Sequence, residues 1–162
     1  MSVAQKIRQA KLLKKNNRPQ EALTILEICL ESTTTTPDLY YQIASLYDFM
    51  GREKEAIPFY EKALTHGLIK ERAEAFLGLG STYRCLGQYR KSLTVFDRAI
   101  KEFPQHRVLR VFRALTTYNL GHATQAVQIL LDQLLATTND ISIKSYDRAL
   151  RLYKDNLDQV WE

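Results

Sequence analysis

The stretch from residue 75 to residue 104 constrains the fold most, because its large and small residues recur at helical spacing. Four of them fall at i, i+3, i+4 and i+7 and so share one helix face: Phe76, Leu79, Gly80 and Tyr83. A glycine inside a helix costs about 1 kcal/mol, so Gly80 indicates the close approach of another backbone. Gly87 ends this helix, and Pro104 follows a second one. The stretch predicts a helix-turn-helix unit that stacks on similar units.

The pattern resembles the tetratricopeptide repeat, which has an aromatic-x2-Leu-Gly-x2-Tyr helix, then an Ala-x3-Phe helix and a proline. The matching residues are Phe76, Leu79, Gly80, Tyr83, Ser92, Phe96, Ala99 and Pro104. A copy 36 residues earlier consists of Tyr40, Ile43, Ala44, Tyr47, Gly51, Ala56, Tyr60 and Ala63. Weaker copies flank these two, with Ala22 upstream and Ala114 downstream.

The resemblance implies an all-α protein of antiparallel helix pairs, an α-solenoid with a right-handed superhelix. We expect one domain over residues 1–162, with about three repeats and a closing helix. Its divisions are a degenerate repeat at 3–36, repeats at 37–70 and 73–106, a degenerate helix pair at 107–138 and a capping helix at 140–161. In the pair at 107–138 the register is open by one residue, because Arg110 and Arg113 stand where apolar residues are expected.

The C-terminal segment has an apolar stripe of helical period: Ile143, Tyr146, Ala149, Leu150, Tyr153, Leu157, Val160 and Trp161. One interpretation is a helix that seals the open end of the solenoid. The other is a self-association helix, since the stripe is long and ends in the only tryptophan.

The net charge of +5 lies at the N-terminus. Residues 1–18 contain six basic side chains and no acid: Lys6, Arg8, Lys11, Lys14, Lys15 and Arg18. Such a helix can bind nucleic acid, anionic lipid or an acidic protein. The alternative is a solvated face of a terminal helix.

No motif in the sequence indicates catalysis. The segment Gly78-Leu79-Gly80-Ser81 lacks the third glycine and the preceding strand of a phosphate-binding loop. The three histidines have no second ligand at metal spacing, and no stretch is apolar enough for a membrane span. We therefore expect a non-catalytic cytoplasmic protein without cofactor or metal, whose two cysteines are free thiols.

Membership in this family implies binding of a protein or peptide on the concave surface, which the first helices of the repeats line. The side chains expected there are Tyr41, Ser45, Asp48, Phe49, Leu77, Ser81, Arg84, Val111, Leu115 and Tyr118. Val111 and Leu115 could instead be core residues in a shifted register. Several arginines, among them Arg84 and Arg107, could pair with carboxylates of an acidic partner. The lysine and asparagine clamp with which some family members hold a terminal carboxylate is not reproduced at these positions.

Overall fold

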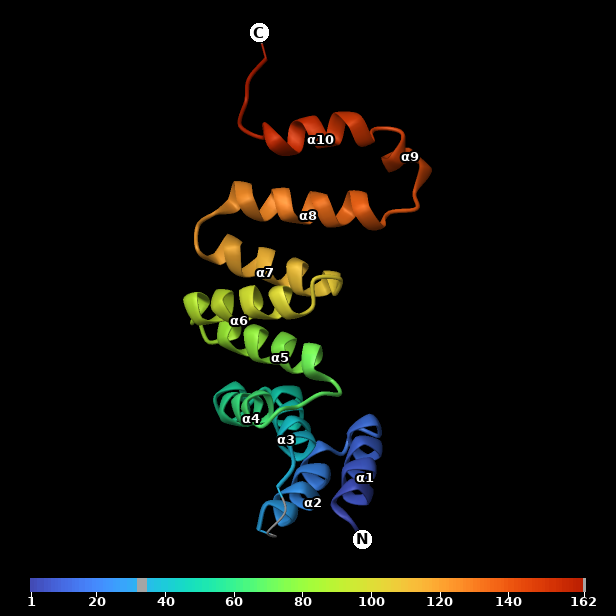
Figure 1. Cartoon of the computed structure of the whole chain (residues 1–162), viewed down its shortest axis with the longest axis vertical. Coiled ribbons are helices and arrows are strands. Elements are labelled where there is room, and N and C mark those ends of the chain that lie inside the picture. Colours follow the sequence, from blue (N-terminus) through green and yellow to red (C-terminus); the bar gives the residue numbers. More distant parts are fainter. Residues whose placement is uncertain (32–34, 162) are drawn as a thin grey trace. The chain divides into compact units, whose positions relative to one another are not determined.

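The structure is a computed structural model that describes residues 1–31 and 35–161, and its regular elements there are ten α-helices. The first eight follow one another in pairs (Figure 1): α1 (Val3–Lys15) and α2 (Pro19–Glu31), α3 (Pro37–Phe49) and α4 (Glu53–Thr65), α5 (Arg72–Cys85) and α6 (Tyr89–Glu102), and α7 (Arg107–Asn119) and α8 (Ala123–Thr137). The short α9 (Ile141–Lys144) and then α10 (Asp147–Asp155) complete the described chain. The predicted all-α fold of helix pairs is confirmed.

Two compact units make up the chain, residues 1–95 and residues 96–162, and the boundary lies within α6. In the first unit α3 packs against α4, α2, α1 and α5, and α4 also packs against α5. In the second unit α8 packs against α7 on one side and against α10 on another. The predicted ranges 3–36, 37–70 and 107–138 each contain one helix pair, and the pair of α5 and α6 begins one residue before the range 73–106.

Local side-chain contacts set where several helices begin. Ser2 and Gln5 form a reciprocal capping box at the start of α1. Thr36 caps α3 by accepting a hydrogen bond from the Leu39 N–H, and Pro37 is the first residue of that helix.

The same turn ends the first helix of each of the four pairs. In each turn one residue has a left-handed backbone: Asn17, Gly51, Gly87 and Gly121. The next residue donates its N–H to the carbonyl five residues back, in the pairs Arg18–Leu13, Arg52–Tyr47, Gln88–Tyr83 and His122–Thr117. Because this turn recurs, Ala114 corresponds to Gly80, and the open register of the pair at 107–138 is settled without a shift.

Small side chains occupy one equivalent buried position in the four first helices: Ala10, Ala44, Gly80 and Ala114. A second glycine, Gly78, lies where α5 meets α4. A Cβ added at Gly78 would overlap the ring of Tyr60. Helix packing therefore accounts for Gly78, as expected from the missing features of a phosphate loop.

Arg110 and Arg113 occupy positions where the repeat pattern has apolar residues, but their charged guanidinium groups are not buried without polar partners. Each guanidinium finds an acceptor in the second unit: the carbonyl of Pro104 at 2.6 Å from Arg110 and a carboxylate oxygen of Asp97 at 2.6 Å from Arg113. Both side chains are half-buried, because long stems can pack while their charged ends reach polar groups.

The prediction of one capping helix over residues 140–161 is wrong, since α9 ends at Lys144 and α10 covers only Asp147–Asp155. The Ser145 hydroxyl donates to the Ser142 carbonyl at 2.8 Å, and that carbonyl would accept the Tyr146 N–H in a continuous helix. The Tyr146 N–H bonds to the Ile143 carbonyl instead. The helix therefore breaks between α9 and α10, at the carbonyl that bonds to a side chain.

Candidate binding groove

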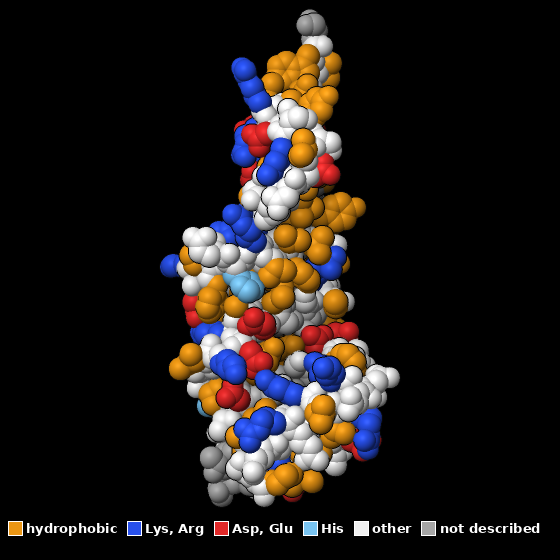
Figure 2. All heavy atoms as spheres, turned by 90° about the vertical axis from the view of Figure 1, so that its right-hand side faces the viewer, with side chains coloured by type: hydrophobic (Ala, Val, Ile, Leu, Met, Phe, Trp, Pro, Cys, Tyr) orange, Lys and Arg blue, Asp and Glu red, His pale blue; other side chains and the backbone are white. Residues whose placement is uncertain are grey.

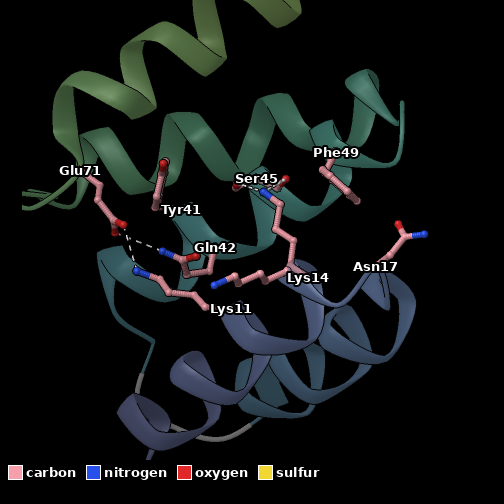
Figure 3. A pocket seen from close by; sticks show the side chains of 9 residues that line it. Lys11, Lys14, Asn17, Tyr41, Gln42, Ser45, Phe49 and Glu71 are labelled. Atoms are coloured by element: carbon pink, nitrogen blue, oxygen red, sulfur yellow. Dashed lines mark hydrogen bonds and ion pairs between the residues drawn. The ribbon is translucent and has the colours of Figure 1, made fainter.

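The first unit has an open groove of about 520 Å³ beside α1, α3 and the start of α5 (Figure 3). We call it the first-helix groove. Its lining residues are Lys11, Lys14, Lys15, Asn17, Tyr41, Gln42, Ser45, Phe49 and Glu71. Figure 2 faces the side on which α1 lies and shows Lys and Arg side chains gathered over the lower part of the molecule, with apolar ones between them.

Two aromatic side chains of α3 line this groove. The Phe49 side chain is 53% exposed, a high value for a phenylalanine in a folded chain. Tyr41 is half-buried, and its hydroxyl has no hydrogen-bond partner among the described residues. Burial, and then the nearby carboxylates of Glu71, Glu74 and Asp48, raise the pKa of Tyr41 to about 12. The hydroxyl is therefore a neutral donor at physiological pH.

Lys14 crosses from α1 to α3 and holds the aromatic wall in place. Its Nζ donates to the Ser45 Oγ at 2.6 Å and to the Ser45 carbonyl at 3.0 Å. The same ammonium lies 5.2 Å from the centroid of the Phe49 ring, within the range of a cation–π contact. Burial lowers the pKa of Lys14, and the charge of Asp48 opposes that shift.

Glu71 closes the other end of the groove from the N-terminus of α5. Its backbone is left-handed, with φ 59°, which costs a residue with a Cβ on the order of 1–2 kcal/mol. Its carboxylate does not cap α5. Instead one oxygen accepts from Lys11 Nζ at 2.9 Å and the other from Gln42 Nε2 at 3.2 Å (Figure 3).

Asp48 belongs to the predicted site but does not line the groove. Its carboxylate accepts a hydrogen bond from the Tyr60 hydroxyl of α4 at 3.1 Å. Burial raises the pKa of Asp48, and the Tyr60 bond and the Lys14 charge only partly offset that. Asp48 therefore joins α3 to α4 in the structure.

Of the ten predicted site residues, the structure brings Tyr41, Ser45 and Phe49 together in the groove. The three on α5, which are Leu77, Ser81 and Arg84, are half-buried and lie outside its lining. The three on α7, which are Val111, Leu115 and Tyr118, belong to the second unit. Val111 and Leu115 are half-buried in the unshifted register, and Tyr118 is 63% exposed. The binding roles of these residues stay predictions.

Sequence reasoning missed the lysine side of the groove. A shift of 34 residues places Lys11, Lys14 and Lys15 at the repeat positions of Ser45, Asp48 and Phe49. The repeat spacing could therefore have joined the basic helix to the groove. Asn17 could have been found in the same way, since it precedes Gly51 by 34 residues.

The second unit exposes apolar side chains on α8 and near the C-terminus. They are Val127, Leu130, Leu134, Leu152, Tyr153, Leu157, Val160 and Trp161. No residue of α9 or α10 is buried. In Figure 2 apolar side chains gather near the upper end of the view. A capping helix was expected to cover the end of the solenoid with its apolar stripe. In the structure much of that stripe is exposed.

None of the described helices combines the length and apolar character that crossing a bilayer requires. Among residues 1–31 and 35–161, no group of three His, Cys, Asp or Glu side chains is arranged to hold a metal ion.

Comparison with known proteins gives the family. The family model described as "Tetratrico peptide repeat" matches residues 37–157. Superkiller protein 3 of Saccharomyces cerevisiae is 30% identical over 78 residues, which are 48% of this chain and 5% of that protein. The chain therefore spans only a small fraction of the length of this relative.

Solved structures share the fold at low sequence identity. MamA is 17% identical with a TM-score of 0.72, covering 99% of this chain and 79% of that one. YrrB, described as a TPR protein with an unusual peptide-binding site, is 17% identical with a TM-score of 0.71 over 86% of this chain and 71% of that one. The match of the family model over residues 37–157, together with the repeated turn and the buried small residues, shows that the chain belongs to the tetratricopeptide-repeat family.

Proposed function

We propose that the chain is a non-catalytic adaptor that binds a segment of another protein in the first-helix groove. The tetratricopeptide-repeat fold supports a scaffold for protein interactions in general. The peptide-binding site described for YrrB supports a peptide as the form of the ligand. The observation that carries the proposal is that one groove is lined by both the exposed ring of Phe49 and the unpartnered hydroxyl of Tyr41.

The groove is prepared for a ligand before one arrives. Lys14 bonds to Ser45 and lies over the Phe49 ring, so it restricts the motion of that ring. A side chain that is already held loses less conformational entropy on binding. Phe49 can then contact an apolar ligand side chain while the Tyr41 hydroxyl donates to a ligand carbonyl.

Selection from a displayed peptide library, followed by affinity measurement, tests this function. In Phe49→Ala we expect a selected peptide to bind about tenfold or more weakly, because a central aromatic contact is lost. Ile28→Ala is the matched control, since Ile28 lies on α2 and is also 53% exposed. It should change the affinity by less than about twofold. Equal effects of the two substitutions, or a library that yields no binder, would contradict the proposal.

A second candidate function is homodimerisation through the C-terminal segment. The exposed apolar side chains of α8 and α10 favour it, because such patches mark interaction surfaces. Light scattering over a dilution series tests it. Tyr153→Glu should convert a dimer to a monomer, whereas Ile69→Glu, at an exposed site of the first unit, should not. A monomeric parent chain at high concentration would remove this candidate.

Nucleic-acid binding by the basic N-terminal helix has no comparable support. Three of the basic residues at positions 1–18 have partners within the chain: Lys11 with Glu71, Lys14 with Ser45, and Arg18 with Glu21. Retention of RNA by the chain with a steep salt dependence would restore this alternative.

A further inference from the structure

The first-helix groove carries more positive charge than its own acid balances. Three lysines line it, and Glu71 is the only acid among the described residues of its lining. Lys15 is exposed and has no partner in the described part of the chain. Lys14 is half-buried, and its contacts are the oxygens of Ser45 and the ring of Phe49. A half-buried ammonium without a contacting carboxylate is complementary to an acidic ligand.

The groove also already binds a carboxylate, which is that of Glu71. Lys11 Nζ donates to Oε1 at 2.9 Å, and Gln42 Nε2 donates to Oε2 at 3.2 Å. The two donors come from different first helices, α1 and α3, so together they form a site for both oxygens of one carboxylate. Glu71 reaches this site from a left-handed backbone that a residue with a Cβ rarely adopts. The acid is therefore a strained occupant of a site that other chain segments supply.

We propose that Glu71 occupies, in the free protein, the position at which the groove binds a carboxylate of an acidic protein segment. This inference rests on the proposed function, and it adds the chemical class of the partner and an internal competitor. The Glu71 side chain is 28% exposed and can turn outward when a partner's carboxylate arrives beside Lys11 and Gln42. Lys15 then supplies a further cation for the acidic segment.

The test measures the affinity of a labelled, end-capped hexaglutamate peptide by fluorescence anisotropy at low ionic strength. Four chains form a cycle: the parent, Glu71→Gln, Lys11→Met and the double variant. Glutamine keeps the size and hydrogen-bonding ability of Glu71 but removes its charge. Glu55→Gln is the matched control, because Glu55 also pairs with a cationic side chain, that of Arg52, but lies on α4 outside the groove. Thermal melting of each variant checks that all of them fold.

We expect Glu71→Gln to bind hexaglutamate about fivefold or more tightly than the parent, because the competing charge is gone. Glu55→Gln should differ from the parent by less than about twofold, because exposed charges are well screened. In the Lys11→Met background the gain from Glu71→Gln should disappear, since the contested cation is absent. If Glu71→Gln gives the same gain in affinity in the Lys11→Met background, the gain comes from the change in net charge and not from competition for Lys11. That result overturns the inference.

Three further outcomes separate this inference from the proposed function. If no variant binds hexaglutamate while library-selected peptides still bind in a Phe49-dependent manner, the inference is overturned and the proposed function stands. If Glu71→Gln binds hexaglutamate no more tightly than Glu55→Gln does, Glu71 does not compete with the peptide. The inference is then overturned, even if the groove binds acidic peptides. Loss of both kinds of binding overturns both proposals.

Discussion

At the scale of single residues, equivalent positions of the repeats differ in how their polar groups are satisfied. Thr82 and Thr116 are related by the 34-residue repeat and are both almost fully buried. The Thr116 hydroxyl donates to the Phe112 carbonyl at 3.4 Å. The Thr82 hydroxyl is the one buried side-chain oxygen without a partner among the described residues. An unsatisfied buried hydroxyl lowers stability.

Thr82→Val should therefore stabilise the chain by about 1 kcal/mol, because valine has the same shape without the unsatisfied hydroxyl. Thr116→Val is the matched control and should destabilise the chain by about 1 kcal/mol. Urea unfolding followed by circular dichroism measures both. A loss of stability in Thr82→Val as large as that in Thr116→Val would show that the Thr82 hydroxyl is satisfied.

Asp48 makes stability depend on pH. Burial raises its pKa in the folded state above the usual 3.8, so its ionisation destabilises the fold once the pH exceeds the raised pKa. Below 3.8 the carboxyl is protonated in both folded and unfolded chains, and the cost vanishes. Asp48→Asn, which stays neutral and can still accept the Tyr60 hydrogen bond, should be more stable than the parent near pH 7. The gain in unfolding free energy of Asp48→Asn over the parent should shrink toward about pH 4. The same gain near pH 7 and at about pH 4 would rule out ionisation of Asp48 as the cause.

At the scale of helices, the contact between α4 and α5 depends on Gly78. A methyl group there would collide with the Tyr60 ring, although alanine favours a helix over glycine by about 1 kcal/mol. We expect Gly78→Ala to lower the free energy of unfolding by about 1–3 kcal/mol through overpacking.

A double-mutant cycle identifies the cause of that loss. In a Tyr60→Leu background, Gly78→Ala should cost less, because the smaller side chain leaves room for the methyl group. Purely additive losses in the double variant would mean that the two residues do not interact.

The helix pairs were predictable because their signals are local. The spacing from Phe76 to Tyr83 and the glycines at 51, 87 and 121 each act within one helix and its turn. The split between α9 and α10 was not predictable from periodicity, because the apolar stripe continues through it. The Ser145 hydroxyl competes with the helix backbone for the Ser142 carbonyl. The pattern of apolar residues contains no information about this hydrogen bond.

At the scale of the whole molecule, the fold and part of the groove could be read from the sequence. Tyr41, Ser45 and Phe49 were placed in the groove because first helices line one face of each repeat. The lysines of α1 follow the same repeat but were considered only as a charged terminus. Glu71 could not be predicted, because its left-handed backbone lies in the connector of a repeat that spans 36 residues where its neighbours span 34.

The most direct test of binding in the first-helix groove is amide chemical-shift mapping by NMR with a library-selected peptide. We expect the largest shifts at Lys11–Asn17 and Tyr41–Phe49, with small shifts on α2 at residues such as Ile28. Shifts concentrated on α8 and α10, with none at Phe49, would contradict binding in the groove and place the ligand on the exposed apolar side chains of the second unit.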